Sequence, residues 1–307
     1  MNVSKNVAYL FMALAATMWA TSGTLTELGL DSGADALQIT VFSVIITTVL
    51  VLVGILAFDR KSLSIDRKDI IPLIVFSQIT STLFSLAWYF CVDYTNVAIA
   101  VVLLYAYPGI VTVASVFFLS ERLTLEKAIA LPLTFVGCML VSGAKDAGEL
   151  DFNLIGVGLG VFAAFAGAVY YIWGKKFLDK YSANTVVLYM YLFSAPALFL
   201  VANPVSVVHT SLPSDAWWYI FLIGLIPGAI APLASMLALR RIQASSASIV
   251  ASIEPVVAVV IAYLVLSQTI TVFQGVGVGL VFLGVVMLRL RTDRAKAEES
   301  EPQQRLL

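Results

Sequence analysis

Long apolar runs separated by short polar segments dominate the chain. Ten of these runs approach the length of about 20 residues that an α-helix needs to cross the hydrocarbon core of a bilayer. They cover residues 7–28, 35–57, 70–93, 96–119, 126–144, 153–176, 183–202, 216–239, 245–267 and 272–290. The pattern therefore predicts an all-α membrane protein with ten transmembrane helices.

Composition agrees with this pattern and excludes several functions. The chain is 60% hydrophobic and 12% charged, with a mean hydropathy of +0.96, whereas an average soluble domain has roughly 25% charged residues. A net charge of -1 offers no basic surface for nucleic acid. Because no nucleotide-binding motif interrupts the apolar runs, we expect no cofactor and no ATP-driven mechanism.

The chain contains an internal repeat. Placing Pro255 over Pro108 (255 − 108 = 147) aligns residues 97–124 with residues 244–271, and the alignment continues without a gap to Gly284 over Gly137. We therefore expect one repeat of five helices over residues 1–144 and a second over 153–291. Residues 292–307 are charged and are expected to form a disordered cytoplasmic tail.

Basic residues predict the orientation. If the N-terminus is cytoplasmic, 17 of the 18 Lys and Arg residues fall on the cytoplasmic side, and only Lys145 lies outside. Both termini are then cytoplasmic. Five helices per repeat is an odd number, so the second repeat enters the membrane upside down relative to the first. Such inverted repeats are a common architecture of secondary transporters.

Short motifs add a family resemblance. They are Trp19-Ala20, Tyr107-Pro108, Ser120-Glu121-Arg122-Leu123-Thr124, Glu254-Pro255 and Ser267-Gln268-Thr269-Ile270-Thr271. With the ten-helix layout, these motifs resemble the EamA-type branch of the drug/metabolite transporter superfamily over nearly the whole chain. The resemblance implies transport of small metabolites such as amino acids, often as export, while other members of the branch move choline, vitamins or nucleobases. Gln268 departs from the glutamate that the family often carries there.

Glu254 is the acidic residue placed near mid-membrane. A charge inside hydrocarbon is costly, so the residue is a candidate for binding substrate or exchanging a proton with it. The alternative is structural, because Pro255 interrupts the helix and a preceding carboxyl can cap the new N-terminus. Pro108 occupies the equivalent position in the first repeat, and paired helix breaks point to a binding site between the repeats.

Polar and aromatic side chains in the spans complete the candidate site. Gln78, Ser81 and Trp88 fall on a polar stripe of the third helix, which should face either an aqueous cavity or a neighbouring helix that it hydrogen-bonds. Trp19, Tyr105 and Tyr107 lie too deep for an interfacial belt and are expected to contact an organic substrate or a cation. The predicted substrate-binding residues are Trp19, Ser22, Gln78, Ser81, Trp88, Tyr105, Tyr107, Tyr170 and Glu254.

Two further groups of residues are interpreted as packing elements. Gly156 and Gly160, like Gly275 and Gly279, have the four-residue spacing that lets membrane helices approach closely. Cys91 and Cys138 are expected to be small packing residues.

The sequence predicts a secondary transporter in the plasma membrane that exports an amino acid or a related metabolite by alternating access, with protons as the coupling ion. Uptake of an organic cation such as choline is the alternative. Rivals from other classes are an intramembrane hydrolase and a non-transporting receptor. The single histidine, His209, lies in a predicted loop, and no cluster has metal-ligand spacing. The oligomeric state is open, with a monomer favoured.

Overall fold

The computed structural model describes residues 4–143, 153–201, 212–266 and 269–304, and every regular element within them is helical. The helices of the first half are α1 (Lys5–Asp31), α2 (Ala36–Phe58), α3 (Ile70–Ser77), α4 (Phe84–Tyr94), α5 (Val97–Leu104), α6 (Tyr107–Leu119) and α7 (Leu125–Val141). The helices of the second half are α8 (Leu154–Leu178), α9 (Ala183–Val201), α11 (Ser214–Ile223), α12 (Ala231–Leu239), α13 (Ala244–Ala251), α14 (Glu254–Leu266) and α15 (Val272–Gln304). The π-helices η3 (Gln78–Leu83) and η4 (Gly224–Ile230) join α3 to α4 and α11 to α12.

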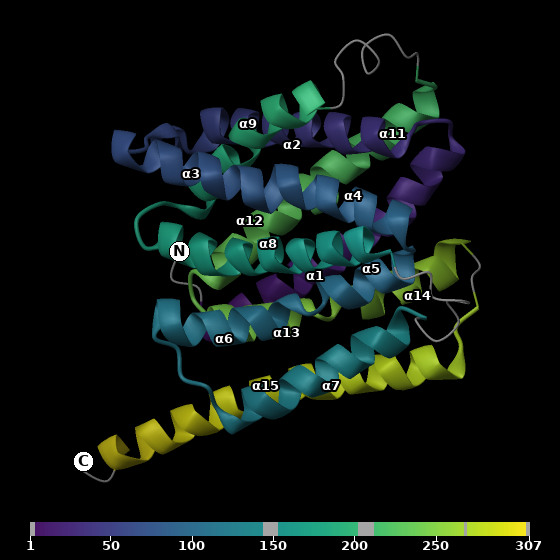
Figure 1. Ribbon diagram of the computed structural model, residues 1–307. Coiled ribbons are helices and arrows are strands. Elements are labelled where there is room, and N and C mark those ends of the chain that lie inside the picture. Colours follow the sequence, from purple (N-terminus) through teal and green to yellow (C-terminus); the bar gives the residue numbers. More distant parts are fainter. Residues whose placement is uncertain (1–3, 144–152, 202–211, 267–268, 305–307) are drawn as a thin grey trace.

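These helices form one bundle, with their axes roughly aligned (Figure 1). Eight continuous segments are long and apolar enough to cross a membrane, and Val272–Leu288 is a shorter apolar helix. The last predicted span of the first half corresponds to α7, which has 17 residues. The all-α membrane fold is confirmed, whereas the count of ten spans stays a prediction.

Both halves interrupt their helices at matching positions. The gap between α5 and α6 follows Leu104, and the gap between α13 and α14 follows Ala251 (104 + 147 = 251). The two π-helices also correspond, since 78 + 147 = 225 falls inside η4. π-Helical segments within α-helices are rare and occur frequently at functional sites. The repeat seen in the sequence thus extends to the local backbone geometry.

The connections fall into two groups, one at each end of the bundle. The N-terminal start of α1 and the C-terminal end of α15 lie at the same end, on the left in Figure 1. We call it the basic end, because the connections 59–69, 120–124, 179–182 and 240–243 lie there and carry many of the basic residues. The opposite end, which holds connections 32–35 and 95–96, is called the far end. Assignment of the basic end to the cytoplasm stays a prediction, and Lys145 lies outside the described residues.

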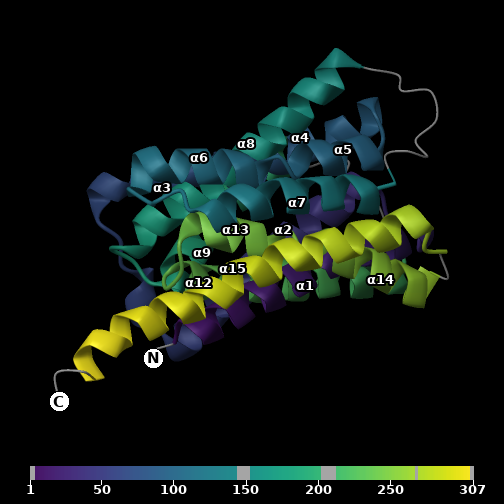
Figure 2. The same ribbon diagram turned by 90° about the horizontal axis from the view of Figure 1, so that it is seen from below.

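The expected disorder after Thr292 is wrong. Helix α15 continues without interruption to Gln304 and extends past the other helices at the basic end (Figure 2). Although this segment is too polar for a membrane, its Arg, Ala, Lys, Glu and Gln residues have high intrinsic helix propensity. Low hydrophobicity therefore did not imply loss of the helix.

Of the four glycines that are predicted to let helices approach closely, two do so. A Cβ atom added at Gly156 or Gly160 would lie 2.7 or 2.5 Å from side chains of the first half, so these glycines permit a close approach to α8. A Cβ atom added at Gly275 or Gly279 would have no neighbour within 4 Å, so the packing role expected for these two glycines is wrong. Helix α15 instead meets α7 through Gly277, where a Cβ would lie 2.7 Å from a backbone oxygen. Spacing alone did not identify which face of the helix is covered.

Candidate functional site

Glu254 begins α14 directly after the break in the ninth predicted span. Its side chain is half-buried, and the following Pro255 is buried. The carboxyl interacts with the hydroxyl of Tyr105, and Tyr107 and Tyr171 lie within electrostatic range of it. The sequence placed Tyr105, Tyr107 and Glu254 at one site, and the structure brings these three side chains together.

An aromatic row extends from this carboxyl across the two halves. We define the row as Tyr105, Tyr107, Tyr171, Tyr170 and Trp19. Successive ring centroids along it are 5.9, 5.6, 5.3 and 6.1 Å apart. Edge-to-face and offset-stacked geometries of this kind are favourable for aromatic pairs. The row connects α6 to α8 and α8 to α1, so it passes between the two repeats.

Tyr171 was missed by the sequence analysis. It follows Tyr170 directly on α8 and stacks on Tyr107 with an interplanar angle of 4°. Adjacent residues of a helix point in directions about 100° apart, so Tyr170 and Tyr171 cannot both face α6. The sequence does not show which of them does, and it pointed only to Tyr170. The hydroxyl of Tyr170 instead pairs with that of Ser235 on α12.

Helix breaks leave carbonyl groups that side chains of the first half satisfy. The hydroxyl of Tyr107 donates to the carbonyl of Ser248 (3.4 Å), and the thiol of Cys138 approaches the carbonyl of Ser252 (3.9 Å). Unpaired backbone groups in hydrocarbon are costly. The break before Glu254 is therefore supported by neighbouring side chains, and both cysteines are free and buried.

The side chains of Gln78 and Ser81 donate hydrogen bonds to residues of α9. The amide of Gln78 donates to the carbonyl of Phe193 (2.8 Å), and the hydroxyl of Ser81 donates to that of Ser194 (3.0 Å). These contacts support the helix-packing alternative for both residues. The neighbouring Thr82 is buried, and its hydroxyl has no partner in the described part of the chain. A substrate contact by Gln78 or Ser81 stays a prediction.

Two predicted residues, Ser22 and Trp88, are not part of the row. Ser22 follows Trp19 by three residues on α1, which places both on one helix face, and it is half-buried. Trp88 is half-buried on α4, a helix that packs against α8. Their role in binding also stays a prediction.

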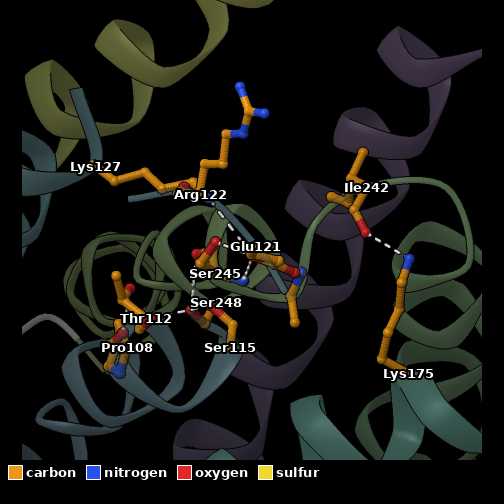
Figure 3. Close-up of polar contacts among 11 residues, drawn as sticks. Pro108, Thr112, Ser115, Glu121, Arg122, Lys127, Lys175, Ile242, Ser245 and Ser248 are labelled. Atoms are coloured by element: carbon orange, nitrogen blue, oxygen red, sulfur yellow. Dashed lines mark hydrogen bonds and ion pairs between the residues drawn. The ribbon is translucent and has the colours of Figure 1, made fainter. Parts of the chain in front are cut away.

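A second polar cluster lies at the basic end, around Glu121 (Figure 3). Its carboxylate accepts hydrogen bonds from the backbone N–H groups of Ala244 (2.6 Å) and Ser245 (3.3 Å) and from the hydroxyl of Ser245. Lys127 lies 3.5 Å from the same carboxylate. The sequence marks Glu121 only as part of a family motif, because the two residues whose backbone N–H groups it accepts, Ala244 and Ser245, are more than 120 positions away.

Further polar contacts at the basic end join the two halves. Lys180 pairs with both Asp66 and Asp69, and these hydrogen bonds raise the pKa of the Lys180 ammonium above its usual value. The amide of Asn184 donates to the carboxylate of Asp59 (2.8 Å). Exposed ion pairs contribute little individually, but the set fixes how the connection after α2 meets the connection after α8.

Within the described residues, no group of three His, Cys, Asp or Glu side chains is arranged to hold a metal ion. His209 lies outside those residues. The titratable side chains around Glu254 are those of Tyr105, Tyr107, Tyr171 and Cys138. This arrangement suits binding of a positively charged or hydrogen-bonding group.

Comparisons with known proteins agree with this architecture. A helical bundle of two related halves, with a carboxyl and aromatic residues between them, is the arrangement of a membrane transporter. The model of the EamA-like transporter family matches residues 6–143 and again 154–290, so the chain belongs to this family.

Relatives are similar over most of their length. An uncharacterized transporter of Archaeoglobus fulgidus is 24% identical, with 86% of this chain and 91% of the relative covered. The uncharacterized transporter YoaV of Bacillus subtilis is 25% identical (79% and 83% covered), and the uncharacterized inner membrane transporter YicL of Salmonella typhimurium is 22% identical (92% and 94% covered). A solved crystal structure superimposes with a TM-score of 0.81 at 16% identity, covering 92% of this chain and 98% of the other, which supports the fold.

Proposed function

We propose that the protein is a secondary transporter that exports a small organic metabolite, an amino acid or a related compound, across the plasma membrane by alternating access. The observation that carries this proposal is the position of Glu254 beside the aromatic row, where the two halves meet. A carboxyl inside a membrane bundle is expensive and usually functional. Here it would bind the ammonium group of the substrate, while the rings contact the rest.

The proposed mechanism uses no nucleotide. Glu254 would exchange a proton for the substrate, so that the proton gradient drives accumulation on one side. Trp19, Ser22, Tyr105, Tyr107 and Tyr170 would line the site, and both termini would lie in the cytoplasm. A monomer suffices, because residues of both halves come from one chain.

Uptake of an organic cation such as choline is the second candidate. A quaternary ammonium over tyrosine and tryptophan faces gains cation–π stabilisation, and the aromatic row next to Glu254 provides such faces. This candidate differs from the first in its substrate, because choline carries no carboxylate whereas an amino acid does.

Flux in proteoliposomes tests both candidates. With an imposed proton gradient, purified protein should move a labelled amino acid in the direction opposite to the protons, and choline or tetramethylammonium should compete poorly. Strong competition by the quaternary amines would favour the cation. Amines and amino acids that bind the folded protein raise its thermal stability. If none of these ligands shows flux, the result would contradict transport and favour a receptor.

A further inference from the structure

Helix α13 receives its N-terminal cap from the other half of the protein. The residue before it, Gln243, makes no side-chain capping bond. Instead, one carboxylate oxygen of Glu121 accepts from the N–H of Ala244, and the other accepts from the N–H and hydroxyl of Ser245 (Figure 3). Free N–H groups and the helix dipole make a helix start favourable for a negative charge.

The capping site is buried and closely fitted. Glu121 is 8% exposed and Lys127 is 3% exposed. Ser120, just before Glu121, adopts a left-handed conformation (φ 53°), which is uncommon for a residue other than glycine. The chain thus accepts a strained turn at the end of α6 that directs the carboxylate toward α13. Removal of such a buried charge partner leaves unsatisfied donors.

The repeat-related position at the far end differs. Val97 begins α5 as Ala244 begins α13 (97 + 147 = 244), yet Val97 is 58% exposed while Ala244 is 0% exposed. Helix α5 is capped locally, because the side-chain oxygen of Asn96 accepts a hydrogen bond from the N–H of Ile99 (2.9 Å). The first turn is therefore covered at the basic end, whereas at the far end Val97 is exposed and the repeat counterpart of Glu121 (121 + 147 = 268) lies outside the described residues.

Packing of the half-helices shows the same asymmetry. All eight residues of α13 are buried, and α13 packs against α6. In α14 the buried residue is Pro255, and in α5 it is Ala100. Among the described residues, α5 and α14 make at most marginal contact, although they are the repeat counterparts of α13 and α6. The structure is closed at the basic end and looser at the far end.

We propose that Glu121 is the latch of the basic end: its carboxylate holds α13 against α6 in the state described here and must leave the α13 N-terminus when that end opens. This inference rests on the proposed alternating access. Glu121 acts through α13 and touches no substrate, so it is a positioning residue for the transport cycle. Loss of the latch shifts the population toward the state open at the basic end.

Thiol labelling of purified protein tests the latch without any transport assay. In a background of Cys91→Ala and Cys138→Ala, Ser248→Cys reports the basic end, one turn inside the latch, and Val97→Cys reports the far end. Each reporter is combined with Glu121→Ala, with Glu121→Gln, or with Glu27→Ala as a control. Glu27 is an exposed carboxylate on α1 near the far end.

Opening one end closes the other in alternating access, so the reporters should change in opposite directions. With Glu121→Ala, labelling of Ser248→Cys should rise about 2- to 30-fold, the range expected from loss of a helix cap, while labelling of Val97→Cys falls. Glu121→Gln keeps an acceptor oxygen and should restore part of the protection, and Glu27→Ala should change neither reporter. A rise at both positions would show a loosened fold, and no change at either would show a static cap; both results would overturn the latch. Because labelling needs no substrate, a failed latch is distinguishable from a failed transport proposal.

Discussion

The rings of Tyr107 and Tyr171 are stacked parallel and offset, with centroids 5.6 Å apart and planes within 4° of parallel. Tyr107 begins α6 at the helix break of the first half, and Tyr171 lies on α8, the first helix of the second half. Both side chains are buried. The contact therefore joins the two repeats beside Glu254, at the proposed substrate site.

Tyr107→Ala should lower transport as well as stability, because the ring is buried. Removal of the ring takes away the stack on Tyr171 and one wall of the proposed site, and we expect kcat/KM for flux to fall about tenfold, equivalent to about 1.4 kcal/mol. Tyr107→Phe keeps the ring and loses only the 3.4 Å hydrogen bond to Ser248, so it should retain most activity. Proteoliposome flux per folded molecule measures both. Equal flux in wild type and Tyr107→Ala would remove this ring from the site.

Gln78→Ala should be destabilising, because it removes the hydrogen bond from the Gln78 amide to the carbonyl of Phe193 inside the bundle. The expected cost is about 0.5–1.5 kcal/mol. Thr82→Val is the matched control one turn later, since the Thr82 hydroxyl lacks a partner in the described part of the chain and valine has nearly the same shape. Unfolding of the purified variants in detergent should separate the two. Full stability with lost transport in Gln78→Ala would instead support the substrate role predicted from the sequence.

The sequence predicted the large-scale fold well because hydrocarbon imposes long apolar helices. Pro108 and Pro255 also located the two helix breaks, since proline cannot donate the helical hydrogen bond. The sequence did not show which neighbour each face meets. Periodicity put Gln78 and Ser81 on one stripe but did not reveal that α9 supplies their partners, which lie about 115 residues later.

The unpredicted contacts join residues that are remote in the chain. Glu121 and the start of α13 are separated by more than 120 positions, and no local pattern marks the pair. Tyr171 was missed for a different reason, because Tyr170 and Tyr171 are adjacent and only tertiary packing decides which ring faces Tyr107. Residue type therefore identified candidates, and the three-dimensional arrangement showed which of them contact one another.

Asp59 should stabilise the basic end at neutral pH and lose this effect in acid. Its hydrogen bonds from Ser62 and Asn184 lower the pKa of the Asp59 carboxyl from its ordinary value of 3.8. Because the folded pKa lies below the unfolded one, the stabilisation is complete above about pH 3.8 and disappears as the pH falls through the folded pKa.

The variant Asp59→Asn tests this pH-dependent stabilisation. The variant should have a lower apparent Tm than wild type at pH 7, and the difference should shrink as the pH is reduced toward 3. Other carboxyl groups titrate in both proteins, so the difference between the two curves isolates Asp59. A constant difference across this range would mean that the carboxylate charge contributes nothing to the junction with Asn184.

Glu254→Gln tests whether the mid-bundle carboxyl couples transport to protons. The amide keeps the shape and most of the hydrogen bonding toward Tyr105 but does not titrate. The other titratable groups that face the carboxyl are Tyr105, Tyr107, Tyr171 and Cys138. Tyrosine and cysteine ordinarily ionise above pH 8, so a pH dependence of transport between 5 and 8 that disappears in Glu254→Gln would arise at Glu254 and not at these neighbours.

A coupling carboxyl and a structural cap give different results for Glu254→Gln. If the carboxyl exchanges a proton, gradient-driven accumulation should fail, while substrate exchange across the membrane survives because it needs no net proton movement. The pH dependence of the wild-type rate should also flatten in the variant. If Glu254 only caps the helix that starts at Pro255, the amide oxygen still accepts a hydrogen bond, and the variant should keep both activities with a stability loss of about 1 kcal/mol or less. Intact accumulation with an unchanged pH profile would remove Glu254 from the coupling mechanism and leave support of the helix break as its role.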